Sequence, residues 1–467
     1  MNHTVEKIGG TSMSRFGEIM QNVIIADHTT ADMYNRIFVV SAYSGITNLL
    51  LEDKKTGAPG VYGHFTAGSG EWRDALARVR EKMIDYNQEF GFLGLNVKEA
   101  NAFINGRLDD IGKFLQDLED MRSYGFMRPG DYLPMTREFL AAVGEVHSAW
   151  NSVKILKANG VNARFIDLSG WRSTESRTLD EAILAGFEGV DFATELPVVT
   201  GYVKFDPGIM LRFDRGYSEI TFSKIAVLTG AREGIIHKEF HLSTGDPKLM
   251  GIDKVQVIGN TNFDIADQLS DMGMEAIHSK AAKEMEMKGI PIRVKNAFDP
   301  HHPGTLISRG YVSPNPRVEM ICGRADMLGV EVFDPEMVGE PGYDYRLTKH
   351  LADRDIDYIA KTTNANTIAH FVPEKSKRLN NCIESIHRDF PNAEIHVTKV
   401  AIVSVIGSNM KIPGFLARAA NALSAAGVNV LAIDQTIRQV NIQFVIEREQ
   451  FECAQKALHR EFVEHQA

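Results

Sequence analysis

The N-terminal stretch combines a lysine, two adjacent glycines and two hydroxyl residues in a pattern suited to binding phosphate. Lys7 precedes Gly9 and Gly10, and Thr11 and Ser12 follow. Glycines let an anion approach the backbone because they carry no Cβ, and the free N–H groups at a helix start attract negative charge. We expect Ser12 to cap the helix and Lys7 to add a mobile positive charge. The alternative for such a glycine pair is a tight turn with a surface lysine.

Two further polar stretches each lead into a predicted helix. Residues 36–42 have the pattern of a buried parallel strand, and a polar turn over 43–48 follows it. In open α/β sheets, ligands gather at turns of this kind. A second stretch, 213–219, contains Arg215 and Glu219. Loop chemistry and helix caps are the alternative interpretation of both stretches.

The bulk composition indicates an ordinary globular protein of two or three domains. The chain has 467 residues, of which 44% are hydrophobic and 24% charged. No apolar run approaches the ~18 residues of a membrane span, and no secretion signal is recognisable. The formal net charge of −10 disfavours a nucleic-acid surface. The 3 scattered cysteines argue for a reducing, cytoplasmic location and against a zinc cluster.

The last third of the chain contains an internal repeat. Gly342 and Gly414 each follow a proline and open a helix, 72 residues apart (414 − 342). Ile368 and Val440 begin matching strands at the same offset. Each repeat has the pattern strand, helix, strand, strand, helix. In the second repeat we expect these elements at 400–406, 413–426, 428–436, 440–446 and 449–462.

The glycine pair belongs to a longer motif that resembles a known family signature. The segment from Lys7 to Ser12 is similar to Lys-Phe-Gly-Gly-Thr-Ser, which opens the aspartokinases of the amino-acid-kinase superfamily, with Ile8 in place of the phenylalanine. The P-loop pattern Gly-x4-Gly-Lys-Ser/Thr does not occur in the sequence.

Two more motifs resemble the same family, in the family's order. Residues 39–48 are similar to Val-Val-Ser-Ala…Gly-x-Thr-Asn, through Ser41 and Thr47. The Gly-Glu pair that ends at Glu145 resembles the family's substrate-contacting glutamate. Without the resemblance, a helical glutamate would be taken as a solvated side chain.

The stretch around Arg215 resembles the family's Gly-Arg-Gly-Gly-Ser-Asp. Arg215 and Ser218 match this motif, whereas Tyr217 replaces a glycine and Glu219 replaces an aspartate. The acid is kept but is one methylene longer.

The nucleotide half departs from the family pattern. Asp246 and Lys248 match the family's Asp-Pro-Arg in kind, but Lys238 stands where an acid is usual and Glu275 where a second phosphate-side lysine is usual. Either the polarity is swapped within the site or nucleotide binding is weakened. We favour the swap, because Lys238 supplies the charge that Glu275 removes. In this respect the chain is similar to the divergent aspartokinases associated with ectoine synthesis.

The resemblance covers nearly the whole chain and implies its fold. It predicts an α/β catalytic domain at 1–305, with a mostly parallel sheet sandwiched by helices. Two α+β ACT modules, βαββα in order, are expected at 306–393 and 394–467. Residues 311–322 are expected to donate a strand to the second module.

The implied activity is ATP- and Mg²⁺-dependent phosphorylation of the side-chain carboxylate of L-aspartate to 4-phospho-L-aspartate, the first step of aspartate-family amino acid or ectoine biosynthesis. A carboxylate is already a nucleophile near pH 7, so catalysis needs alignment and charge neutralisation rather than a general base. A sibling kinase for another small acidic amino acid and a catalytically impaired, amino-acid-sensing paralogue are the alternatives.

The resemblance also divides the site residues into two halves. On the nucleotide half it implies Lys7, Gly9, Gly10, Ser12, Lys238, Asp246 and Lys248. On the substrate half it implies Ser41, Thr47, Glu145, Arg215, Ser218 and Glu219. Lys7, Glu145 and Arg215 are the predicted catalytic residues, with Glu145 on the ammonium and Arg215 on the α-carboxylate of aspartate. No protein metal site is predicted.

The ACT modules imply an amino-acid effector, with lysine or threonine as first candidates. The turn that would hold it contains Met337, Gly342 and Tyr343, and Asp357 on the following strand would meet the effector's ammonium. The modules are also expected to join two chains as a homodimer or higher homo-oligomer, and this is the alternative role if no effector binds.

Overall fold

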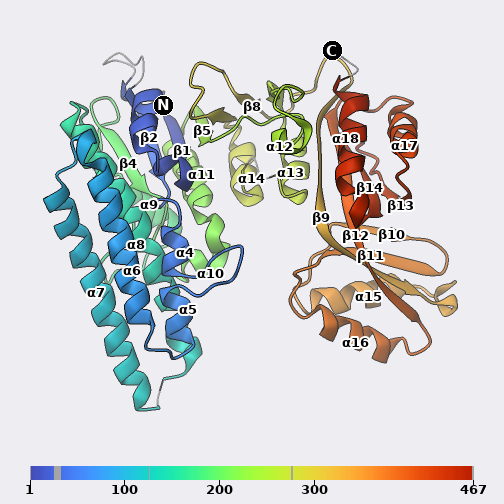
Figure 1. The fold of residues 1–467 in the computed structure, drawn as a ribbon, viewed down its shortest axis with the longest axis horizontal. Coiled ribbons are helices and arrows are strands. Elements are labelled where there is room, and N and C mark those ends of the chain that lie inside the picture. Colours follow the sequence, from blue (N-terminus) through green and yellow to red (C-terminus); the bar gives the residue numbers. More distant parts are fainter. Residues whose placement is uncertain (1, 26–32, 126, 275–276, 465–467) are drawn as a thin grey trace. The chain divides into compact units, whose positions relative to one another are not determined.

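The chain folds as two compact units in a computed structural model that describes residues 2–25, 33–125, 127–274 and 277–464. Unit 1 comprises Met1–His241 with Ile277–Arg309, and unit 2 comprises Leu242–Ala276 with Gly310–Ala467 (Figure 1). The predicted domain boundaries at residues 305 and 393 stay predictions.

The core of unit 1 is a mostly parallel sheet. Its strands are ordered β3-β4-β2-β1-β5-β7-β8; neighbours are parallel except for the antiparallel pair β7 and β8. Every residue of β2 and β4 is buried, as expected for parallel strands covered on both faces. The strands are β1 (Thr4–Ile8), β2 (Arg36–Val40), β3 (Ala163–Ile166), β4 (Leu196–Thr200), β5 (Glu233–Lys238), β7 (Ile292–Asn296) and β8 (Thr305–Ile307).

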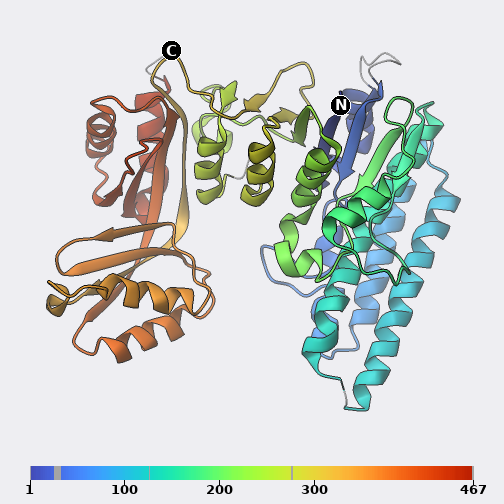
Figure 2. The ribbon, with the colours of Figure 1, turned by 180° about the vertical axis from the view of Figure 1, so that it is seen from behind.

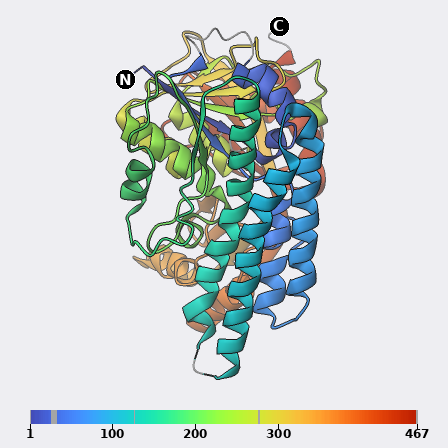
Figure 3. The same cartoon turned by 90° about the vertical axis from the view of Figure 1, so that its left-hand side faces the viewer.

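Long helices accompany this sheet. Figure 3 shows three of them, α6 (Trp72–Glu89), α7 (Val97–Ser123) and α8 (Pro129–Ala158), lying side by side. The central turns of α8 are buried on all sides, from Leu140 to Val153. The other helical segments of unit 1 are α1 (Gly10–Met13), α2 (Phe16–Ile19), η1 (Met20–Ile25), α4 (Ile46–Leu50), α5 (Val61–Thr66), η2 (Phe90–Leu93), α9 (Leu179–Gly186), α10 (Ile209–Phe213), η3 (Asp214–Gly216), α11 (Tyr217–Thr229) and α14 (Ser279–Lys288).

The two faces of the sheet carry different side chains because residues alternate along a strand. On one face, α11 and α14 pack so closely that a Cβ on Gly234 would meet Phe222 and Met285. The opposite face carries Glu6, whose partner Arg36 donates to two carbonyls of η1. Lys7, next along β1, therefore faces the side of α11.

The turn after β1 corrects one prediction. Helix α1 begins at Gly10 with Gly9 as its N-cap in an extended conformation, and Ser12 lies inside the helix, buried, so the predicted Ser12 cap is wrong. The helix starts directly after the strand, which leaves no room for a capping residue further along. The next helix turns one face to the core, because Phe16 and Ile19 are fully buried.

Unit 2 is built on an antiparallel sheet with the order β10-β11-β9-β12-β14-β13. The N-terminal part of β9 pairs with the C-terminal part of β12, Cys322 opposite Ser404, and its C-terminal part pairs with the start of β12, Val330 opposite Val397. The strands of this sheet are β9 (Arg317–Phe333), β10 (Ala360–Thr363), β11 (Thr367–Pro373), β12 (Glu394–Ser408), β13 (Val430–Asp434) and β14 (Asn441–Glu447). The residues of unit 2 also include the short strand β6 (Asn260–Thr261), which is outside this sheet.

The helices of unit 2 follow the predicted repeat. Figure 2 shows α15 and α16 side by side in orange, and Figure 1 shows α17 and α18 in red beside β14. Val318 and Ile321 of β9 are in the same buried apolar cluster as Phe415 and Leu458. The helical segments are α12 (Pro247–Met250), α13 (Phe263–Asp271), η4 (Pro335–Met337), α15 (Tyr343–Ala352), α16 (Leu379–Asp389), α17 (Phe415–Ala425), η5 (Arg448–Gln450) and α18 (Phe451–Phe462).

The predicted fold class is confirmed: a mostly parallel sheet with helices, followed by two strand-helix-strand-strand-helix repeats. The three cysteines are free. Among the described residues, no helix is both long enough and apolar enough to cross a lipid bilayer.

Candidate active site

The carboxyl ends of the parallel strands bring most of the predicted site residues of unit 1 to one edge of the sheet. Gly9 follows β1, Ser41 follows β2, Gly201 follows β4, and Lys238 ends β5. These four strands are neighbours in the sheet. Ligands of open α/β sheets bind at this edge.

Two lysines flank a buried carboxylate there. The Nζ atom of Lys7 lies 3.2 Å from Oε1 of Glu219, and both side chains are mostly buried, with exposed fractions of 13% and 16%. The backbone N–H of His278 donates to Oε2 of the same carboxylate at 2.5 Å. Burial by itself would raise the pKa of Glu219, but the charges of Lys7 and Lys238 and the His278 hydrogen bond outweigh it and lower that pKa. Glu219 is therefore ionised and holds Lys7 in place.

The two glycines after Lys7 have different roles. A Cβ on Gly10 would lie 2.7 Å from the carbonyl oxygen of Ala42, so this position needs glycine for packing. A Cβ on Gly9 would meet nothing within 4 Å, so the space beside its Cα is open. Gly9 is thus the glycine of the pair that has free space beside it.

A second buried carboxylate lies nearby. Glu145, on α8, is 2% exposed and accepts a hydrogen bond of 2.6 Å from the Ser218 hydroxyl at Oε1, while its Oε2 has no protein partner. Burial raises the pKa of Glu145 to about 8, although Ser218 and the charge of Lys7 act in the opposite direction. An ammonium group placed at Oε2 would stabilise the ionised form.

Arg215 fastens two segments of the edge together. Its Nη1 donates to Oδ1 of Asn48 at 2.9 Å, and its Nη2 donates to the carbonyls of Thr47 at 3.1 Å and Glu52 at 2.7 Å. Glu52 in turn makes two 2.7 Å hydrogen bonds with Arg137 of α8. The structure therefore brings the predicted residues Arg215 and Thr47 into contact, and much of the guanidinium is engaged with the chain itself.

Ser41 is tied to the helix that carries Glu145. Its carbonyl oxygen accepts a 2.8 Å hydrogen bond from the hydroxyl of Ser148, one turn after Glu145 on α8. Its own backbone N–H donates to Ile8 of β1. The end of β2 is therefore fixed between the strand of Lys7 and the helix of Glu145.

Some predicted nucleotide-side residues lie elsewhere. Asp246 and Lys248 belong to unit 2, where the Asp246 side chain caps α12 by accepting from the Lys248 N–H at 2.9 Å. Ser12 is buried within α1. Glu275 lies outside the described residues.

Four residues of this edge were not among the predicted site residues. Asn48 and His278 stand inside the compared motifs, so their positions were signalled by the sequence. Glu52 and Arg137 carry no such signal, because their pairing joins segments 85 residues apart.

The predicted effector residues lie in the first repeat of unit 2. Met337 and Tyr343 are buried in its apolar core, and the Tyr343 hydroxyl donates to Asp334 at 2.5 Å. Gly342 caps α15 in a left-handed conformation with φ of 82°. Asp357 is exposed and precedes β10, so its predicted place on the strand is wrong; a turn separates α15 from β10 at this point.

Comparison with known proteins identifies the family. Residues 2–296 match the amino acid kinase family, and residues 403–462 match an ACT domain. The aspartate kinase Ask_Ect from Stutzerimonas stutzeri strain A1501 is 50% identical over 464 residues, which cover 99% of this chain and 98% of that relative.

Solved structures have the same fold. Escherichia coli aspartokinase III in complex with aspartate and ADP, in the R-state, matches with a TM-score of 0.74 at 20% identity, over 98% of this chain and 99% of that chain. The same enzyme in complex with lysine and aspartate, in the T-state, matches with a TM-score of 0.71 at 19% identity, over the same shares of the two chains. From the family match and the close relative together, the chain belongs to the aspartate kinases of the amino acid kinase family.

Proposed function

We propose that the chain transfers the terminal phosphoryl group of ATP to the side-chain carboxylate of L-aspartate, forming 4-phospho-L-aspartate. The observation that carries this proposal is the pair of buried carboxylates at one strand edge, Glu145 with an open oxygen and Glu219 holding Lys7. The first suits an ammonium group and the second orients a cation toward phosphate.

The N-terminal turn neutralises the negative charge of the transferring phosphoryl group. Lys7, positioned by Glu219, and Gly9, which has open space beside its Cα, lie at the start of α1. The phosphoryl group passes through a transition state with charge spread over its oxygens, and preorganised donors stabilise that charge. The attacking carboxylate needs no general base, because it is ionised near pH 7.

The substrate's α-groups are assigned to Glu145 and Arg215. Two atoms without a hydrogen-bond partner support this assignment. Oε2 of Glu145 is available to the ammonium group, and Nε of Arg215 is available to the α-carboxylate. Ser41 and Thr47 are proposed on the side-chain carboxylate, where Ser218 and Glu219 complete the substrate half. Holding both reactants in line is itself a large part of such catalysis.

Lys238 is proposed as the second phosphate-side cation. Its charge lowers the pKa of Glu219, so it lies within electrostatic reach of the carboxylate that holds Lys7. This supports the polarity swap over weakened nucleotide binding. Asp246 and Lys248 are kept as proposed nucleotide ligands of unit 2.

Mg²⁺ fits this site as a companion of the nucleotide. Among the described residues, no group of three or more His, Cys, Asp or Glu side chains converges on a metal position. Mg²⁺ is commonly held by one or two carboxylates together with substrate phosphates rather than by an all-protein cage. When bound, it neutralises phosphate charge, and Glu219 is the carboxylate nearest to the Lys7 position.

A coupled assay of ADP release tests the function directly. The purified full chain is supplied with ATP, Mg²⁺ and either L-aspartate or L-glutamate. ADP release with aspartate, and at least about tenfold less with glutamate, supports the proposal. Equal rates would assign the chain to a sibling kinase, and no release with either acid would assign it to a non-catalytic sensing role.

We further propose that the enzyme works in the cytoplasm as a homodimer joined through the ACT repeats, and that its product enters aspartate-family amino acid or ectoine synthesis. Sedimentation of the full chain tests the dimer. Metabolite analysis of a deletion strain tests the pathway: loss of ectoine alone, without a need for lysine or threonine, would assign the enzyme to ectoine.

A further inference from the structure

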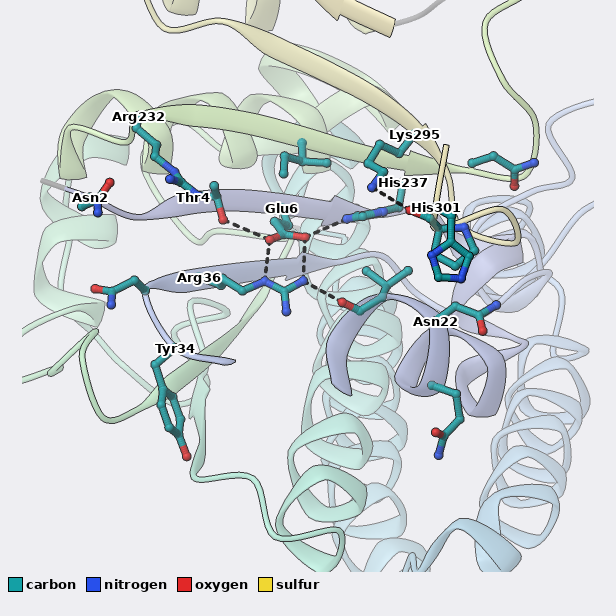
Figure 4. A pocket seen from close by; sticks show the side chains of 16 residues that line it. Asn2, Thr4, Glu6, Asn22, Tyr34, Arg36, Arg232, His237, Lys295 and His301 are labelled. Carbon is teal, nitrogen blue, oxygen red and sulfur yellow. Dashed lines mark hydrogen bonds and ion pairs between the residues drawn. The ribbon is translucent and has the colours of Figure 1, made fainter. Parts of the chain in front are cut away.

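A polar cavity of about 790 Å³ lies on the face of the unit 1 sheet that is turned away from Lys7. Its floor is formed by β1, β2, β5 and β7, and η1 contributes one wall (Figure 4). Ligand pockets commonly have volumes of about 300–1,000 Å³. The cavity is therefore large enough for a metabolite.

A fixed network of charges forms the base of the cavity. The Glu6 side chain is buried, with 2% of it exposed. Its carboxylate accepts hydrogen bonds from Arg36 Nε at 2.7 Å, from Arg36 Nη2 at 3.1 Å and from the Thr4 hydroxyl at 3.0 Å. Nε2 of His237 lies 2.7 Å from the same carboxylate. Burial opposes ionisation of Glu6, but Arg36 and His237 outweigh it and hold its pKa well below the usual range. Glu6 and Arg36 thus cancel each other's charge.

Two more cations line the same cavity beyond this pair. Lys295, opposite His237 across β5 and β7, is partly buried, and its Nζ donates to the carbonyl of Pro300 at 3.0 Å. Burial lowers the pKa of Lys295. Arg232 is exposed at the other end of the cavity. Because Arg36 already balances Glu6, the lining has a surplus of positive charge.

One buried atom of the network has no partner. His237 is 5% exposed and lines the cavity; its Nε2 is engaged with Glu6, while its Nδ1 makes no hydrogen bond within the protein. Buried polar atoms without partners are uncommon and mark places where a ligand or water is missing. When Nε2 of the neutral ring donates to Glu6, Nδ1 is an acceptor.

We propose that this cavity binds a small polar metabolite through an anionic group, a phosphate or a carboxylate, which is held by Lys295, while Nδ1 of His237 on the neighbouring strand accepts a hydrogen bond from a hydroxyl group of the ligand. Asparagine side chains supply neutral hydrogen-bonding groups around it, including Asn22 and Asn296. This site is separate from the proposed kinase chemistry.

The cavity and the active-site edge lie back to back on the same two strands. Glu6 and His237 face the cavity, and the next residues, Lys7 and Lys238, face the opposite side. A ligand that draws on His237 therefore acts on the strands that position both lysines.

Calorimetric titration of the full chain tests the proposal. Inorganic phosphate and succinate are the two probes, and saturating ADP with L-aspartate keeps the kinase site filled. Lys295→Met and Lys295→Gln should each weaken binding of the effective probe by about tenfold or more, the loss of one charge-assisted contact. Lys288→Met, which removes the same charge from an exposed site on α14, should leave it unchanged.

The outcomes separate the possibilities. Binding of phosphate alone assigns a phosphate-bearing ligand, binding of succinate alone assigns a carboxylate, and binding of both assigns the shared anion chemistry. If wild-type protein takes up neither probe at about 10 mM, or if the Lys295 and Lys288 variants bind alike, the proposal is overturned. Lys295→Gln keeps a donor for the Pro300 carbonyl, so this variant decides the matter even if Lys295→Met does not fold.

Discussion

Glu145 combines deep burial with an unused oxygen, and its ionisation controls what it can bind. With a pKa of about 8, it is mostly protonated at pH 7 in the absence of substrate. An ammonium group binds to the ionised form, so protonation must be reversed on binding. If Glu145 holds the substrate's ammonium group, as proposed, it couples substrate affinity to pH in a range where most carboxylates are already fully ionised.

We expect the KM for aspartate to fall as pH rises from about 6.5 to 8.5, because more of Glu145 becomes ionised. Glu145→Gln should raise KM and remove this part of the pH dependence, while the KM for ATP changes little. Steady-state kinetics across the range measures it. Glu138→Gln, on the same helix but bonded to Tyr202, serves as control. A wild-type pH profile retained in Glu145→Gln would assign the dependence to another group.

The same group makes an opposite prediction for stability. Its folded pKa lies above its unfolded value, so the unliganded fold loses stability as pH rises from about 4.5 towards 8. Gln mimics the protonated acid, so Glu145→Gln should be more stable than wild type at pH 8.5, by up to about 4 kcal/mol, and equal to it at pH 4. Denaturant titration at both pH values measures this. Equal stability at pH 8.5 would mean that Glu145 ionises without cost.

Lys7 is predicted to act on the transferring phosphoryl group. Lys7→Ala should lower kcat by about 10²–10³-fold, as loss of a preorganised charge partner does. Lys113→Ala, on the exposed side of α7, removes the same charge and should have no effect. Single-turnover measurement would separate chemistry from product release. A kcat close to wild type would remove Lys7 from the mechanism.

At the scale of elements, we expect the two glycines of the turn from β1 to α1 to have different roles, Gly10 in packing and Gly9 in ligand binding. Gly10→Ala places a Cβ 2.7 Å from the Ala42 carbonyl, so it should destabilise the fold. Gly9→Ala points into open space and should keep the fold but lower kcat, since the added methyl group obstructs the phosphate. Thermal unfolding and kinetics on both variants test this. Wild-type kcat in Gly9→Ala would show that no anion approaches there.

The sequence motifs predicted which residues lie together at the site better than they predicted the hydrogen bonds among them. Lys7 and Glu219 are 212 residues apart in sequence, and the matched motifs placed both at the site. The motifs gave no warning that Arg215 is held by the Thr47 and Glu52 carbonyls, because such bonds depend on backbone geometry. The prediction that Ser12 caps the helix was wrong for the same reason, because the backbone geometry of the preceding turn sets the residue at which a helix begins.

The cavity beside Glu6 could not be predicted from the sequence. Its residues come from separate strands, from η1 and from the segments that flank the strands. Only the register that sets Glu6 near His237, and His237 opposite Lys295, gathers them. Sequence patterns fix which face a residue takes, but not which neighbours it meets across three strands.

At the scale of the whole molecule, we expect any regulation by an amino-acid effector to rest on unit 2. Met337 and Tyr343 are part of the apolar core, so an effector would contact the Gly342 backbone rather than their side chains. Asp344 is paired with Lys361 at 2.7 Å, which offsets part of the negative charge near this turn. An effector can act only if it binds two states of the molecule with unequal affinity.

We expect weak inhibition by lysine or threonine. Titration of each, singly and together, into the kinase assay up to about 10 mM measures it. Gly342→Ala, which strains a left-handed position, should weaken any response without changing the uninhibited rate. A flat response to both amino acids would leave the repeats with the single role of joining chains.

The alternation of Glu6 with Lys7 also limits how this gene can vary through insertion and deletion. A one-residue deletion within β1 that preserved strand pairing would move each side chain to the opposite face of the sheet. The carboxylate of Glu6 would then lie on the phosphate side, and the ammonium group of Lys7 would lie against Arg36. Substitutions can alter either face alone, but a frame-preserving length change damages both at once. Lineages of this enzyme should therefore keep the length of β1 constant even where its apolar residues drift.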